Sequence, residues 1–151
     1  MIFYYPNEAA VERVGRGLLD RSLPKTEWTH AAHFAATLWL LRHRADLRLE
    51  RDLPPLIRAY NEATGGANTD TDGYHETITQ ASIAAARAFL NLHPAERSLH
   101  EMVDLLMASA LGDRDWLLAY WTRSRLFSVE ARRTWIDPDR RPLPEFPHLL
   151  P

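Results

Sequence analysis

A chain of 151 residues has the usual length of one domain and is long enough to bury a hydrophobic core without disulfide or metal staples. The sequence contains no cysteine, which excludes disulfides, thiolate nucleophiles and cysteine-based metal centres. The formal net charge is -2, from 18 Lys and Arg against 20 Asp and Glu, and this balance argues against nucleic acid as a partner.

The N-terminal residues do not read as a targeting segment. They lack the basic region and the long apolar stretch of a signal peptide. The best apolar run, residues 34–41, is far too short to cross a bilayer. We therefore expect a soluble, cytoplasmic protein without a membrane partner.

Apolar residues recur at helical spacing in several segments, and no segment alternates apolar and polar residues over the length of a strand. This pattern predicts an all-α fold, a single-domain helical bundle of six to seven helices over residues 1–151. A first helix is expected from an Asn7 cap to about Asp20. A second is expected from about Glu27 to Arg44, and because it is apolar nearly all round it should lie in the middle of the fold.

A third helix is expected to begin after Asp52, because Pro54 and Pro55 suit only a first turn. The loop over residues 64–73 is rich in turn-forming residues and leads into a fourth helix, which Asp72 is well placed to cap. The fourth and later helices are expected over residues 74–92, 98–110, 113–121 and 128–135. An extended, proline-rich C-terminal tail follows from residue 137.

Polar residues fall on helix faces that otherwise carry core residues. His30 and His33 share such a face on the second helix, and His75 shares one with Thr79 and Ser82 on the fourth. Buried polar groups need partners, and helices two and four of an up-and-down bundle run parallel. We therefore predict one shared pocket, in which His30 or His33 lies within one water molecule of His75 and the 64–73 loop controls access.

A divalent transition metal such as Zn, Fe, Mn or Ni is one explanation for this pocket. Two imidazoles three residues apart on one helix can bind one ion, and a facing imidazole and a carboxylate can complete the site. The predicted ligands are His30, His33, His75 and Glu27. In an enzyme the metal would activate water, and Glu76 or Glu27 would transfer protons.

The motifs match known metal sites only in part. Glu27-x-x-His30 lacks the second copy that a di-iron bundle needs, and the His75-Glu76 motif has Thr79 where a zinc protease has its second histidine. Residues 68–73 match the first six positions of a calcium loop, but Thr79 also stands where that loop requires a bidentate glutamate.

Alternatives from other classes stay open. One is a metal-free enzyme with His75 as general base and a neighbouring carboxylate to orient it. A second is a small-molecule site beside the loop, lined by Tyr60, Asn68 and Tyr74. A third is a non-catalytic interaction domain or homo-oligomer that uses exposed aromatics among Trp116, Trp121 and Trp135. Any single histidine here is also well explained as a core residue bonded to a backbone carbonyl.

Two segments resemble those of a group of small bacterial helical proteins. They are Glu27-Trp28-Thr29-His30-Ala31-Ala32-His33 and the residues Asn68-Thr69-Asp70-Thr71 with Gly73-Tyr74-His75-Glu76-Thr77. No activity is established for that group. The resemblance therefore implies no substrate, cofactor or catalytic residue.

Overall fold

The computed structural model describes residues 2–143, and in that range it contains helices, turns and loops but no β-strand. The α-helices are α1 (Glu8–Leu19), α2 (His30–His43), α3 (Leu49–Ala63), α4 (Glu76–Asn91), α5 (Leu99–Ala108), α6 (Arg123–Leu126) and α7 (Val129–Arg133). Three 3-10 turns are η1 (Lys25–Glu27), η2 (Ala110–Gly112) and η3 (Trp116–Ala119). The predicted all-α helical bundle is confirmed. None of the described helices is long and apolar enough to cross a membrane.

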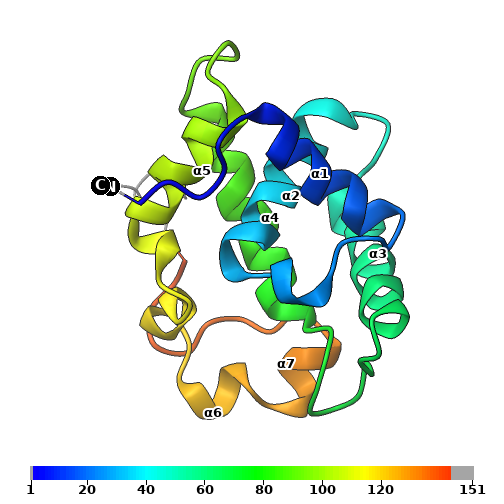
Figure 1. The fold of residues 1–151 in the computed structure, drawn as a ribbon. Coiled ribbons are helices and arrows are strands. Elements are labelled where there is room, and N and C mark those ends of the chain that lie inside the picture. Colours follow the sequence, from blue (N-terminus) through cyan, green and yellow to red (C-terminus); the bar gives the residue numbers. More distant parts are fainter. Residues whose placement is uncertain (1, 144–151) are drawn as a thin grey trace.

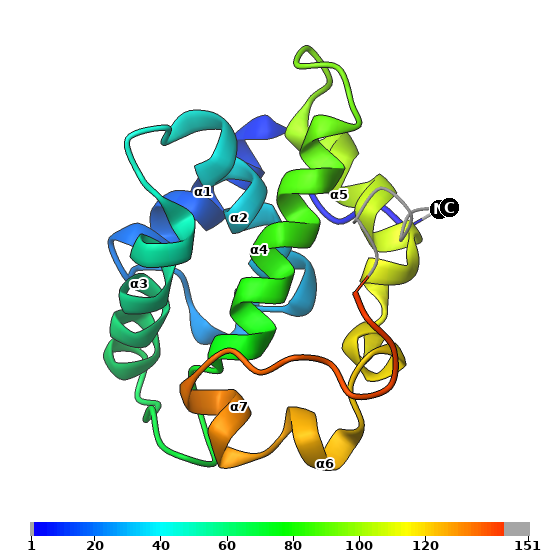
Figure 2. The same ribbon diagram turned by 180° about the vertical axis from the view of Figure 1, so that it is seen from behind.

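Helix α2 lies at the centre of the bundle, as its nearly continuous apolar sequence predicts. It packs against α1, α4 and α5, and residues such as Ala32, Leu38 and Leu40 are fully buried. Figures 1 and 2 show α2 and α4 running in the same direction through the middle of the molecule, with α6 and α7 at the end where α4 begins. The predicted parallel pairing of the second and fourth long helices is therefore present.

The approach of α1 to α2 depends on a glycine. A Cβ atom at Gly15 would lie 2.4 Å from a ring carbon of Trp39, which is closer than real Cβ contacts allow. The Trp39 side chain is buried in this contact. Gly15 weakens α1 in helix propensity, but its missing side chain lets the indole pack directly on the α1 backbone.

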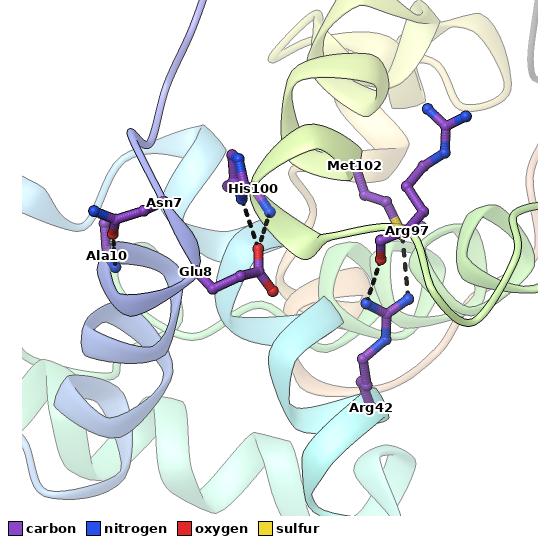
Figure 3. A network of polar contacts seen from close by, with 7 residues as sticks. All are labelled: Asn7, Glu8, Ala10, Arg42, Arg97, His100 and Met102. Carbon is purple, nitrogen blue, oxygen red and sulfur yellow. Dashed lines mark hydrogen bonds and ion pairs between the residues drawn. The ribbon is translucent and has the colours of Figure 1, made fainter.

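Polar contacts join α1 and α2 to the start of α5, as Figure 3 shows. The Glu8 carboxylate accepts hydrogen bonds from the backbone N–H of His100 at 2.7 Å and from its Nδ1 at 2.8 Å. The Arg42 guanidinium donates to the backbone carbonyl of Arg97 at 2.6 Å. The Asn7 side chain accepts from the N–H of Ala10 and caps α1 as predicted.

Helix α3 begins at Leu49, earlier than predicted, so that its two prolines lie inside the helix. Pro54 has no N–H to donate to the carbonyl of Glu50, four residues earlier. The side-chain amide of Gln80 on α4 donates to that carbonyl at 2.9 Å instead. The carboxylate of Glu50 also pairs with Arg87 of α4. Contacts from α4 thus compensate for Pro54 and hold α3 beside α4.

Helices α2 and α4 both begin later than predicted, and this changes the environment of two predicted site residues. Helix α2 begins at His30 with Thr29 as its cap, so that Glu27 belongs to the separate turn η1. Helix α4 begins at Glu76 and is capped by the Nδ1 atom of His75, which accepts from the N–H of Ile78 at 3.1 Å, rather than by Asp72. Helical-face arguments therefore do not apply to Glu27 or His75.

The predicted helix over residues 113–121 is replaced by the short turn η3. The Asp113 side chain accepts from the N–H of Asp115 at 2.8 Å, a local bond that competes with helix formation. After α7, residues 134–143 form no helix, and the N–H of Arg140 donates to the carbonyl of Tyr120. The tail is thus extended over η3 up to residue 143, and the rest of the predicted tail lies outside the described residues.

Candidate functional site

A cavity of about 770 Å³ opens between α2, α3, α4 and the segment 112–127. This volume is typical of small-molecule sites, which occupy about 300–1,000 Å³. Most of its wall is apolar, with contributions from Phe34, Leu53, Ile57, Ile78, Ile83, Met107, Trp116, Leu117, Leu118, Leu126 and Phe127. The cavity can therefore hold a mainly apolar body.

Three segments of the chain contribute polar side chains to the cavity lining. Helix α2 contributes His30, His33 and Thr37, α4 contributes Thr79 and Ser82, and the segment before η3 contributes Arg114 and Asp115. The polar strip predicted on the inner face of α4 is therefore present at Thr79 and Ser82. The two predicted histidines of α2 face the same space.

His33 has a fixed tautomer. Its Nδ1 lies 2.7 Å from the backbone carbonyl of Thr29, and a carbonyl oxygen only accepts, so Nδ1 must carry the hydrogen. The ring packs on the indole of Trp28 with 3.9 Å between centroids. Its other nitrogen, Nε2, makes no hydrogen bond within the part of the chain that the structure describes. In the neutral ring, Nε2 is a hydrogen-bond acceptor that the described residues leave unpaired, on a residue that lines the cavity.

His33 is an exposed residue that lines the cavity, and its ring is neutral at pH 7. Desolvation is the largest cause and lowers its pKa to about 4, and the positive charge of Arg114 acts in the same direction. The neutral ring therefore accepts, and does not donate, a hydrogen bond at Nε2.

His30 is held by the protein backbone. Its Nε2 donates to the carbonyl of Leu111 at 2.8 Å, and its ring meets Phe34 edge-on with 5.3 Å between centroids. This bond to a backbone carbonyl is the structural role left open for a single histidine, at a half-buried position. The bond joins the first residue of α2 to η2 and so fixes one rim of the cavity.

His75 does not line the cavity. Its Nδ1 caps α4, and its Nε2 donates to the carbonyl of Leu126 at 2.6 Å, so both ring nitrogens are occupied. Burial is the main cause that lowers its pKa, which keeps the ring neutral. Neither nitrogen is available for a metal or a substrate proton. His75 instead supports the wall, because Leu126 and Phe127, which it contacts, line the cavity.

The predicted carboxylates are also engaged elsewhere. Glu27 is exposed on η1 and forms a two-pronged ion pair with Arg13 of α1. Glu76 accepts a hydrogen bond from the hydroxyl of Tyr74. Neither of them lines the cavity. The prediction that Glu27 lies beside the histidines assumes that the second helix begins near Glu27. Helix α2 begins three residues later, at His30, so this helical spacing does not exist.

The residues predicted to bind a ligand beside the loop have structural roles. The Tyr60 side chain is fully buried and its hydroxyl donates to the carbonyl of Leu23. The Asn68 side chain accepts from the N–H of Tyr74 at 3.1 Å and holds the loop closed on itself. Arg133 pairs with Asp70 and attaches the loop to α7. The 64–73 loop thus packs against α3 and α7, away from the cavity lining.

The predicted metal ligands are not brought together. Within residues 2–143, no three His, Asp or Glu side chains lie close enough to hold one ion. Of the four predicted ligands, only His30 and His33 face the cavity. Metal binding therefore stays a prediction without an assembled ligand set in this part of the chain.

The tryptophans offered as an interaction surface are mostly internal. Trp121 is fully buried, Trp116 is 7% exposed and Trp135 is 42% exposed. Trp135 packs edge-on against Trp121. Only one of the three therefore offers a large apolar surface to a partner.

Sequence reasoning missed the wall formed by residues 112–127. Arg114, Asp115 and Phe127 come from segments far from α2 in the chain, and no helical period links them to it. Two adjacent charged residues such as Arg114 and Asp115 do not by themselves indicate a site.

Comparison of the chain with models of protein families, with curated proteins and with solved structures gave no match.

Proposed function

We propose that the protein binds, in this cavity, a small molecule with a mainly apolar body and one hydrogen-bond donor. The observation that carries the proposal is His33: a neutral imidazole with Nδ1 held by Thr29 and a free Nε2 acceptor on an apolar cavity. Sites for small molecules combine apolar walls with few, well-placed polar groups in this way.

The energetics favour such a ligand over a fully polar one. Burial of apolar ligand surface contributes about 25 cal/mol per Å², and the walls at Ile78, Ile83 and Leu117 supply the apolar contact. A hydroxyl or N–H on the ligand would give Nε2 of His33 its missing partner.

Filling the cavity from α4 tests the proposal. Ser82 lines the cavity and is half-buried, so that Ser82→Phe places a ring in the ligand's space. Ala84 lies two residues further on α4, is also half-buried and does not line the cavity, and Ala84→Phe is the matched control. We expect 1-octanol, 4-propylphenol or indole to bind the unsubstituted protein and A84F, and S82F to weaken that binding at least about ten-fold.

Binding would be measured by saturation-transfer NMR and titration, with melting temperatures of all three proteins as a check on folding. A folded S82F protein that binds the probes as tightly as A84F would place the ligand elsewhere. If none of the probes binds the unsubstituted protein, the cavity is not a site for this class of molecule.

A further inference from the structure

The cavity wall carries one positive charge, that of Arg114, which no carboxylate of the described residues neutralises in an ion pair. Arg114 lines the cavity and is exposed, and it forms no ion pair with a carboxylate of residues 2–143. Its charge nevertheless reaches His33, where it disfavours protonation of the ring. Both residues line the same cavity, so that one ligand can meet the acceptor of His33 and the donors of Arg114 together.

We propose that the ligand is an apolar monoanion whose carboxylate is bound by Arg114 and whose adjacent hydroxyl or N–H donates to Nε2 of His33. The guanidinium presents paired N–H donors that match a carboxylate. A carboxylate alone would not satisfy His33, because two acceptors would then face each other. This inference rests on the proposed function and adds the chemical class of the ligand.

The other charges around the cavity favour a single negative charge over a phosphate dianion. Arg114 is the one Lys or Arg side chain among the lining residues of the described chain, and Asp115 beside it is negative. A second negative charge on the ligand would have no cation to meet and would be repelled by Asp115. Removing the Asp115 charge should therefore strengthen binding, while removing the Arg114 charge should weaken it.

Four probes with one eight-carbon chain separate the two polar contacts: 2-hydroxyoctanoate, octanoate, 1,2-octanediol and 1-octanol. We expect 2-hydroxyoctanoate to bind about ten-fold more tightly than 1,2-octanediol, because only the former offers a carboxylate to Arg114. It should bind about three- to ten-fold more tightly than octanoate, which lacks the donor for His33.

Three substitutions assign these preferences by isothermal titration. Arg114→Gln should abolish the preference for the carboxylate and leave 1,2-octanediol binding unchanged, while Asp115→Asn should increase that preference. His33→Phe keeps a ring beside Trp28 and should abolish the advantage of 2-hydroxyoctanoate over octanoate. Because Arg114 and Asp115 are exposed, their variants are expected to fold. Raising the salt concentration should reduce the carboxylate preference alone.

The outcomes distinguish the two proposals. If the neutral probes bind and S82F prevents it, but the carboxylates bind no more tightly or R114Q leaves their preference intact, the ligand class is wrong and the proposed function stands. If no probe binds in a way that S82F prevents, both proposals fail.

Discussion

Replacing His75 with alanine is expected to lower the free energy of unfolding by about 1.5–5 kcal/mol. The cap that Nδ1 gives to the N–H of Ile78 is lost, which costs about 0.5–2 kcal/mol. The carbonyl of Leu126 loses its partner inside the protein, which costs about 1–3 kcal/mol. Urea denaturation at pH 7 measures the sum.

His75→Asn is the matched control. Asparagine is a good helix cap, so this variant should recover the part of the stability that comes from α4 and not the bond to Leu126. Equal stability of H75A and H75N would contradict the role assigned to the cap, and an unchanged stability of H75A would contradict both roles.

His75 should also make the free energy of unfolding depend on pH. The folded-state pKa of His75 lies below its ordinary value of 6.5, mainly because of burial. The unfolded chain therefore binds more protons below about pH 6.5, and the free energy of unfolding falls as the pH drops further. His33 contributes with the same sign. H75A should show a shallower decline between pH 6.5 and 4.5 than the unsubstituted protein.

Replacing Thr77 with valine is expected to lower the free energy of unfolding by about 2–3 kcal/mol. The Thr77 side chain is fully buried and its hydroxyl lies 2.8 Å from the carbonyl of Ala131 and 2.9 Å from that of Thr134. The same oxygen accepts from the N–H of Ile136. Valine keeps the shape and leaves these backbone groups unpaired.

Thr77→Ser separates the hydroxyl from the packing. Serine keeps the oxygen and loses one methyl group, which is worth about 1 kcal/mol. Urea denaturation of both variants should therefore rank T77S above T77V. The reverse order would mean that the methyl group, and not the bond from α4 to the segment after α7, holds this end of the bundle together.

The helices could be predicted because apolar periodicity reflects burial directly. The apolar residues of α2 fix its central place, and the period of α4 turns Thr79 and Ser82 toward the cavity. The position of His33 follows from the same period. The direction in which these side chains face is determined by their own helix alone.

The hydrogen-bonding roles of the site residues depend on where the helices begin and on which distant segments meet, and apolar periodicity indicates neither. The tautomer of His33 is set by the carbonyl of Thr29, and therefore by the residue at which α2 begins. The apolar period predicts His75 inside α4 with its ring facing the core, whereas His75 is the cap of that helix. Arg114 lines the same cavity as α2 although it lies far from α2 in the chain, and no local pattern predicts this.

The central claim is that His33 is a neutral acceptor on a ligand-binding cavity, and the ring nitrogens of His33 report on it directly. In a two-bond ¹H–¹⁵N correlation spectrum at pH 7, we expect the pattern of the neutral tautomer protonated at Nδ1. Adding 1-octanol should move the Nε2 signal of His33 toward that of a hydrogen-bonded nitrogen and leave His75 unchanged. A charged His33, the opposite tautomer, or an Nε2 signal that saturating 1-octanol does not move would contradict the claim.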